Sequence, residues 1–511
     1  MTVSYASPWG FTTFKNMATL GLLASSKLAS ALPSPRQAPI PDFTTSEAGN
    51  PFLDGWYADP DTEFYNGEYW IFPTYSDVYE AQTFMDAFSS PDLVHWTKHP
   101  KVLSFDNISW GHKALWAPAA IERDGKYYLY FGANDILIDE IEQGLVGGIG
   151  VAVADRPEGP YVDAIGEPLI GDFHNGAQPI DQDVFIDDDG QAYIYYGGHS
   201  HANVAKLNDD MISLGTFDDG TVFKEITPEN YTEGSQMIKR NGVYYFMWSE
   251  GGWTGPDYSV SYAMADNPLG PFKRLANILK QDSAVARGSG HNGVINVPGT
   301  DIWYLTYHRR PLSETNGNHR VTCYERIYFE EDGTIRDIEM LVKDNFADGQ
   351  MIAWKTSGAG EWAVEDERLR GSLEGEGLTF AMLDTNFTDV AFEAVLSVPD
   401  FTSSTAGLVF RASSLDPGDG EYYWTKLRAD GVELGLTTQE SESVLGQGSG
   451  TYEAGVDYHV KVVAIQGEIE VFVDDMDTAV ASATDVTLIV GANGVLLSGS
   501  AVFDDVAVLR P

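Results

Sequence analysis

The chain is poor in cysteine and in basic residues, and it contains no long apolar run. Its single cysteine, Cys323, excludes an intramolecular disulfide and a zinc cluster built on cysteines. No stretch reaches the ~20 apolar residues that a membrane-spanning helix needs, so no membrane partner is expected. Only 31 Lys and Arg residues stand against 76 Asp and Glu, a net charge of −45. This argues against a nucleic-acid partner, because phosphate binding depends on basic side chains.

The N-terminal segment has the pattern of a targeting signal. An apolar run over residues 18–24 is followed by small residues at 29–31, as in a signal-peptidase site. We therefore expect a signal peptide over residues 1–31, a linker over 32–48 and a secreted, extracellular protein; translation could start at Met1 or at Met17. Asn-X-Ser/Thr sequons of a glycoprotein fit this location and occur at Asn107, Asn230 and Asn386.

One pattern recurs through the first two thirds of the chain. A turn glycine is followed by an aromatic, β-branched strand, as in "NGEYWIFPTYS", "DGKYYLYFGAND", "DGQAYIYYGGHS" and "NGVYYFMWSEGG". Asn-Gly and Asp-Gly favour hairpin turns, because such turns need positive φ. Five units of similar length predict a five-bladed β-propeller over residues 49–345 rather than a sandwich with several hairpins. The turn glycines are Gly67, Gly125, Gly190, Gly242 and Gly299.

Three carboxylates precede these turns at a similar distance. Asp59, Asp181 and Glu233 lie eight or nine residues before their turn glycines, so the same strand of each blade should bring them to the propeller axis. Such a trio suits glycoside hydrolysis, in which one carboxylic acid protonates the leaving oxygen and one carboxylate activates water. A third negative charge raises the pKa of the acid. Asp183 competes with Asp181, because both point to the same strand face.

The C-terminal third has shorter segments with clean alternation of apolar and polar residues. Stretches such as "VAFEAVLSV" and "YHVKVVAI" predict an antiparallel β-sandwich over residues 346–511. This domain could bind polysaccharide or only pack on the propeller. Tyr422, Tyr423 and Trp424 are candidates for facing a sugar, although not all three can face one ligand.

Six motifs resemble glycoside hydrolase family 43. They are "WYADPD", "SPDLVHW", "LWAPAA", "IDQDVFIDDDG", "TEGSQMIKRNGVYYFMWS" and "GSGHNGV", in family order over residues 50–340. The resemblance implies an all-β chain, a five-bladed β-propeller followed by a jelly-roll β-sandwich. It also implies an inverting mechanism with Asp59 as general base, Asp181 as pKa modulator and Glu233 as general acid.

Further residues are expected to bind the substrate. Trp116 is a candidate sugar platform, Tyr57 a pocket wall beside Asp59, and Arg320 a contact to a hydroxyl group. The resemblance places His291 near the axis, where it would help to hold an ion through water. No cofactor is expected to be required, and a structural calcium ion is possible.

The expected function is release of α-L-arabinofuranosyl groups from arabinoxylan or arabinan of plant cell walls, by a monomer. A β-xylosidase or an endo-arabinanase of the same family would use the same acids, and only loop shape would differ. A non-catalytic carbohydrate-binding propeller would bind sugar without turnover.

Overall fold

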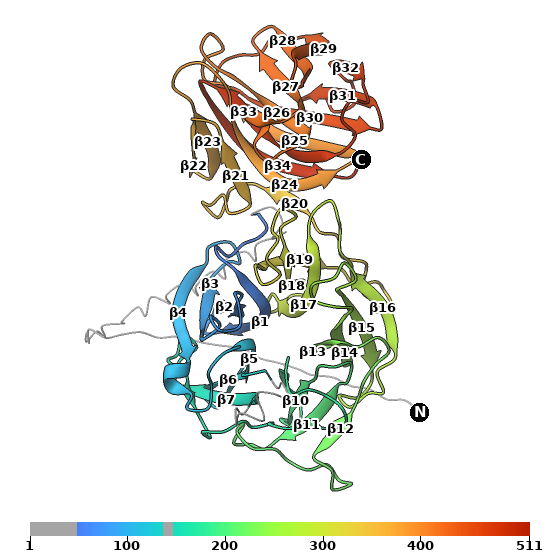
Figure 1. Cartoon of the computed structure of the whole chain (residues 1–511). Helices are drawn as coiled ribbons and strands as arrows, with labels where there is room; N and C mark the ends of the chain where they lie inside the picture. The colour runs from blue at the N-terminus through green and yellow to red at the C-terminus, as the bar shows by residue number, and fades with distance from the viewer. Residues whose placement is uncertain (1–48, 136–146) are drawn as a thin grey trace, which may run out of the picture. The chain divides into compact units, whose positions relative to one another are not determined.

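The computed structural model describes residues 49–135 and 147–511, and all of these belong to one compact unit (Figure 1). The expected signal peptide and linker lie outside the described residues. Within the described part, strands dominate, and the helical pieces are two 3-10 turns, η2 (Phe105–Asn107) and η3 (Pro417–Asp419). No helix in this part is long and apolar enough to cross a membrane.

Five small antiparallel sheets come first, each built from strands that follow one another in sequence. Blade 1 contains β1 (Tyr57–Tyr65), β2 (Glu68–Tyr75), β3 (Phe84–Ser90) and β4 (Thr97–Ser104). Blade 2 contains β5 (Trp116–Arg123), β6 (Lys126–Ala133), β7 (Gly148–Ala154) and β8 (Val162–Asp163). Blade 3 contains β9 (Asp183–Ile186), β10 (Ala192–Tyr196), β11 (Asn203–Leu207) and β12 (Phe223–Glu225). Blade 4 contains β13 (Glu233–Arg240), β14 (Val243–Glu250), β15 (Ser259–Ala265) and β16 (Arg274–Leu279). Blade 5 contains β17 (Arg287–Asn296), β18 (Trp303–Arg310) and β19 (Val321–Ile327).

The first strands of the blades close into a ring around an axis. Going round the ring, β1 packs beside β5, β5 beside β9, β9 beside β13, β13 beside β17, and β17 beside β1 again (Figure 1). The turns between first and second strands have the geometry that their residues demand. Asn66 and Gly67, for example, have φ of 54° and 91°, which a hairpin of this type needs. The propeller predicted from the repeat is confirmed.

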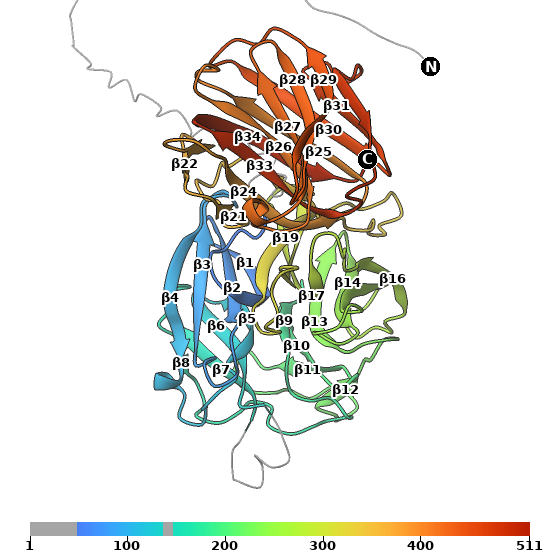
Figure 2. The ribbon, with the colours of Figure 1, turned by 45° about the horizontal axis from the view of Figure 1, so that its top comes forward.

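The C-terminal part folds into two further antiparallel sheets (Figure 2). One has the strand order β22-β23-β34-β25-β30-β31-β32, and the other β21-β24-β33-β26-β27-β28-β29. The strands of the first sheet are β22 (Glu361–Glu365), β23 (Arg368–Ser372), β25 (Val390–Ser397), β30 (Asp457–Ile465), β31 (Glu468–Val473), β32 (Ala481–Thr484) and β34 (Ser500–Leu509). Those of the second are β21 (Trp354–Ser357), β24 (Thr379–Phe387), β26 (Thr405–Ala412), β27 (Tyr422–Arg428), β28 (Gly431–Thr437), β29 (Glu442–Ser449) and β33 (Gly491–Ser498). The short strand β20 (Val342–Asp344) pairs with β34; the boundary expected between 345 and 346 stays a prediction.

The two C-terminal sheets share one apolar core. Phe392 and Leu396 of β25 lie in the same cluster as Leu408 and Phe410 of β26, and all four are fully buried. The aromatic run on β27 is buried as well: Tyr422, Tyr423 and Trp424 are 4%, 0% and 1% exposed. The expectation that some of these rings face a sugar is therefore wrong, and they serve as core.

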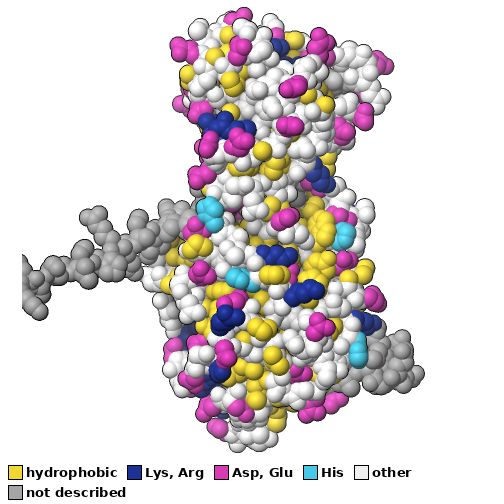
Figure 3. Space-filling model, turned by 90° about the vertical axis from the view of Figure 1, so that its left-hand side faces the viewer, with side chains coloured by type: hydrophobic (Ala, Val, Ile, Leu, Met, Phe, Trp, Pro, Cys, Tyr) yellow, Lys and Arg dark blue, Asp and Glu magenta, His cyan; other side chains and the backbone are white. Residues whose placement is uncertain are grey.

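The surface carries the acidic excess in a dispersed form. Asp and Glu side chains are spread over the whole face seen in Figure 3, with Lys and Arg between them. Such a distribution favours solubility without a strong field at one point.

Candidate active site

In each blade, one residue in or just before the innermost strand has a left-handed conformation, at the same distance from the turn glycine. Asp59, Ala117, Asp181, Gly234 and His291 have φ of 48°, 42°, 54°, 71° and 47°. Each lies eight or nine residues before its turn glycine. A non-glycine residue with positive φ is uncommon and costs free energy, so its recurrence here marks a shared backbone feature at the axis. Glu233 directly precedes the fourth of these residues.

Asp59 is held as a buried carboxylate. Its Oδ1 accepts a hydrogen bond of 2.8 Å from Nη1 of Arg320, and the Nδ1 atoms of His308 and His291 lie 3.1 and 3.3 Å from the same oxygen. Burial alone would raise the pKa of Asp59, but Arg320 and the two histidines hold it well below its usual range. Burial lowers the pKa of His308 to about 3, so Arg320 is the main positive charge on Asp59. Asp59 is therefore ionised at neutral pH.

Asp181 and Glu233 differ from Asp59, because their surroundings raise their pKa values and favour the protonated forms. Burial, and after it the charge of Asp59, raises the pKa of Glu233 to about 7. Burial also raises the pKa of Asp181 well above its usual value, with the charges of Glu233 and Asp59 acting in the same direction. Tyr258 donates a 3.0 Å hydrogen bond to Oε1 of Glu233. Near neutral pH, Asp181 and Glu233 can therefore hold a proton, whereas the neighbouring Asp59 stays ionised.

Asp61 and Asp183, two positions after Asp59 and Asp181, bind the backbone and side chains of neighbouring blades. Asp61 accepts a 2.6 Å hydrogen bond from the backbone N–H of Ala120, in the next blade. Asp183 accepts 2.7 Å and 3.1 Å bonds from the N–H of Met237 and the amide of Gln236, again in the next blade. These carboxylates join neighbouring blades, so Asp183 is not the third acid of the pocket.

The three acids open into one small pocket of about 220 Å³. Of the residues expected from sequence, Trp116, His291 and Arg320 line it with Asp59, Asp181 and Glu233. Sequence reasoning missed the other lining residues, which come mostly from loops between strands and carry no repeat phase. They are Tyr79, Asp135, Gln178, Ile180, His199, Trp253 and Asn318.

Tyr57 does not line this pocket. Its side chain is 2% exposed and packs in the core between blades 1 and 5, with its hydroxyl donating to Asp86 at 2.7 Å. The pairing of β1 is irregular between Ala58 and Asp61, and Asp59 has a positive φ, so Tyr57 and Asp59 do not share a strand face although they are two positions apart. The expectation of a substrate contact at Tyr57 is therefore corrected.

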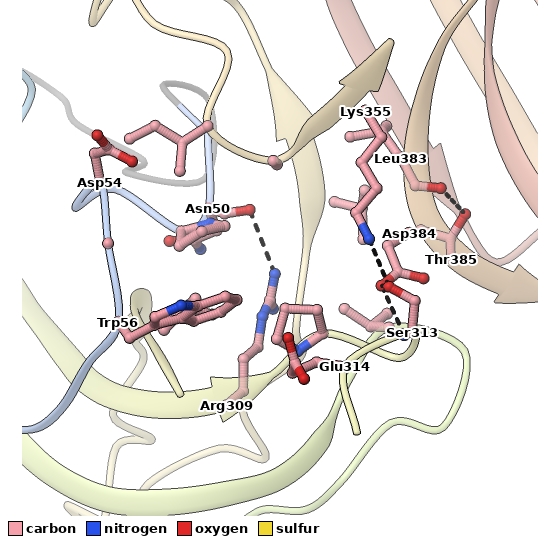
Figure 4. A pocket seen from close by; sticks show the side chains of 18 residues that line it. Asn50, Asp54, Trp56, Arg309, Ser313, Glu314, Lys355, Leu383, Asp384 and Thr385 are labelled. Carbon is pink, nitrogen blue, oxygen red and sulfur yellow. Dashed lines mark hydrogen bonds between the residues drawn. The ribbon is translucent and has the colours of Figure 1, made fainter. Parts of the chain in front are cut away.

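Trp56 faces a second hollow, of about 350 Å³ (Figure 4). Arg309, Glu314, Lys355 and Asp384 also line it. One face of the Trp56 ring stacks on His319, with 4.6 Å between ring centroids. His319 precedes the Asp59 partner Arg320 in sequence, so this loop separates the two hollows.

The described residues contain no group of three or more His, Cys, Asp or Glu side chains placed to hold a metal ion. Nδ1 of His291 already faces Asp59 at 3.3 Å and Asp181 at 3.5 Å. Calcium takes ~6–8 oxygen ligands, and the side chains at His291 do not supply such a set. The calcium ion stays a prediction.

Comparison with known proteins gives consistent matches to one family. The model of "Glycosyl hydrolases family 43" matches residues 48–335. The β-D-galactofuranosidase xynD of Aspergillus niger is 45% identical over 59% of this chain and 87% of its own. The xylosidase/arabinosidase 43A of Humicola insolens is 31% identical over 54% and 95% of the two chains. The arabinoxylan arabinofuranohydrolase of Bacillus subtilis is 29% identical over 57% and 64%. A solved β-xylosidase/α-arabinofuranosidase from a compost metagenome, in complex with xylotriose, is 28% identical over 57% and 97%, with a TM-score of 0.48.

Proposed function

Because the chain belongs to glycosyl hydrolase family 43, we propose that it is a secreted, inverting exo-glycosidase that releases α-L-arabinofuranosyl residues from arabinoxylan or arabinan. The observation that carries this proposal is the pairing of an ionised Asp59 with the protonatable Asp181 and Glu233 around one small pocket. The signal-like N-terminus and the sequons support secretion.

The chemistry follows from the protonation states. Asp59 accepts a proton from a water molecule as that water attacks the anomeric carbon, and Arg320 keeps this carboxylate ionised and oriented. Glu233 donates its proton to the glycosidic oxygen as the bond breaks. Since Tyr258 already donates to Oε1, the transferable proton is expected on Oε2 of Glu233. Asp181 competes with Glu233 for protons and so tunes the acid.

Pocket size supports action at a chain end. A pocket of about 220 Å³ is smaller than the ~300–1,000 Å³ pockets that take drug-sized ligands. It suits one sugar ring, and Trp116 and Trp253 supply aromatic faces in its lining. An endo-acting enzyme would need an open groove that binds several rings on both sides of the acids.

A second candidate substrate is β-D-galactofuranose, favoured by the 45% identity to a β-D-galactofuranosidase. This sugar has the ring configuration of α-L-arabinofuranose and carries one additional hydroxymethyl group at carbon 5. A binding pocket distinguishes two substrates that differ by one such carbon by only ~10–200-fold in kcat/KM. Activity on both furanosides from one pocket is therefore expected.

A panel of 4-nitrophenyl glycosides tests the substrate assignment. We expect the highest kcat/KM for the α-L-arabinofuranoside, a value ~10–200-fold lower for the β-D-galactofuranoside and the lowest for the β-D-xylopyranoside. On arabinoxylan the product should be free arabinose without xylose. Release of xylose from linear xylan at a higher rate would make the protein a β-xylosidase and would overturn the assignment. A preference for the galactofuranoside would select the second candidate.

A further inference from the structure

Two arginines stand directly opposite each other on neighbouring strands of blade 5. Arg287 at the start of β17 pairs in register with Arg310 at the end of β18. Like charges in such a cross-strand pair destabilise a sheet. In the part of the chain that the structure describes, neither forms an ion pair within 4 Å with a carboxylate. In a chain with 76 acidic residues, this local excess of positive charge is unexpected.

Arg310 is the buried member of this pair. It is 8% exposed, and Nη2 donates to the carbonyl of Thr254 at 2.8 Å. Its Nε has no hydrogen-bond partner among the residues that the structure describes. Burial and the charges of Arg320 and Arg287 lower the pKa of Arg310 from its ordinary value. A buried cation with an unused donor retains the desolvation cost that an anion would relieve.

Both arginines line a hollow of about 680 Å³. Its wall is otherwise rich in neutral polar side chains, which can exchange hydrogen bonds with sugar hydroxyls: Thr254, Gln281, Ser283, Ser413 and Ser414. One carboxylate, Asp384, also lines it and accepts two 2.8 Å hydrogen bonds from Ser313. The volume is enough for one or two sugar rings.

This hollow adjoins the acid pocket through one loop. Trp253 lines the acid pocket, and the next residue, Thr254, lines the arginine hollow. The Trp253 ring lies 5.4 Å from the guanidinium carbon of Arg320, the partner of Asp59. A polysaccharide held in the acid pocket would therefore meet the arginine pair with a neighbouring residue or branch.

We propose that the Arg287–Arg310 hollow is a subsite for a carboxylate-bearing sugar, a hexuronic acid residue on the same polysaccharide. The planar guanidinium groups match a carboxylate with paired hydrogen bonds, and the hydroxyl and amide groups of the wall match the ring. This inference rests on the proposed function, because it takes the ligand to be part of the glycan that is cleaved.

Calorimetric titration tests the subsite with a matched pair of ligands. The probes are xylotriose bearing one glucuronic acid branch and unbranched xylotriose, added to the Glu233→Gln enzyme. The enzyme is produced in a host that attaches no N-glycans, because Asn386 lines the same hollow. We expect the acidic probe to bind at least about tenfold more tightly, and this preference to shrink with added salt. Equal affinity for the two probes would overturn the proposal. Stronger binding of glucose 1-phosphate than of the acidic probe would also overturn it, in favour of a phosphate site.

Variants separate binding from a structural role. Arg287→Gln should remove the preference for the acidic probe, whereas Arg336→Gln, an exposed arginine paired with Glu330, should retain it. Because the arginine pair is repulsive, Arg287→Gln should leave the melting temperature equal or higher; a fall would indicate a structural role and contradict the proposal. In the otherwise wild-type enzyme, Arg287→Gln should leave hydrolysis of 4-nitrophenyl α-L-arabinofuranoside unchanged. Failure of the wild-type enzyme to hydrolyse this glycoside would overturn the proposed function and not the subsite.

Discussion

Replacing Glu233 with alanine should lower the rate of arabinose release from arabinoxylan by roughly 10²–10⁴-fold, the usual size of a general-acid contribution. The sugar leaving group is a poor one and needs a proton as the bond breaks. Glu233 is the acid whose pKa, about 7, lets it carry that proton near neutral pH. The measurement is the initial rate of arabinose release. The control is Glu229→Ala, which removes an exposed glutamate four residues earlier.

The leaving group and the pH separate this role from a loss of folding. A 2,4-dinitrophenyl glycoside departs as a weakly basic phenolate and needs no proton, so the deficit of Glu233→Ala should shrink by at least tenfold on it. In the wild-type enzyme, activity should be present below pH 7 and fall above it, because the acid form of Glu233 is lost as pH rises through its pKa. This basic limb should disappear in the variant. If Glu233→Ala lost the same rate factor on arabinoxylan and on the dinitrophenyl glycoside, or kept rates near wild type, Glu233 would not be the general acid.

Replacing Asp59 with asparagine should lower hydrolysis by a similar factor of roughly 10²–10⁴, but for good and poor leaving groups alike. The base acts on water, and water attack is needed whatever group departs. The matched control is Asp54→Asn in the same segment, an exposed carboxylate outside the acid pocket.

The melting temperature of Asp59→Asn must be measured together with its hydrolysis rate. Asp59→Asn leaves the buried Arg320 without its carboxylate, and breaking a buried ion pair costs ~3–5 kcal/mol. Rates are therefore compared well below the melting temperature of each variant. A folded Asp59→Asn enzyme that recovers wild-type rates on the dinitrophenyl glycoside would contradict the role of base, because it would then behave like an acid variant.

That three candidate acids line one pocket could be predicted from sequence because the fold is a repeat. One spacing, eight or nine residues before a turn glycine, selects Asp59, Asp181 and Glu233. His291 was expected from the family resemblance, and it lies at the same spacing before Gly299. The same phase in blade 2 falls on Ala117, which explains why that blade adds no acid. Counting along the chain was therefore enough to predict that these three acids lie together.

Residues outside the repeat could not be found in this way. Trp253 lines the pocket, whereas Tyr258 and His308 contact Glu233 and Asp59, and none of the three lies at the repeated position before a turn glycine. Tyr57 was misplaced because a sequence does not say which side of a strand faces the blade core. On β27, alternation places Tyr423 in one apolar cluster and Tyr422 and Trp424 in another, so both faces of that sheet are covered and no ring is left for a sugar.

The stereochemistry of the first-formed product tests the central claim most directly, because it reports the sugar released and the way in which Asp59 acts. Proton NMR of arabinoxylan in the first minutes after addition of enzyme, before mutarotation, resolves the two anomers. If Asp59 activates water and Glu233 protonates the leaving oxygen, the first signal should be that of β-L-arabinofuranose, inverted from the α-linked substrate. Initial formation of the α-anomer would show that a carboxylate attacks the sugar itself, and it would contradict the account.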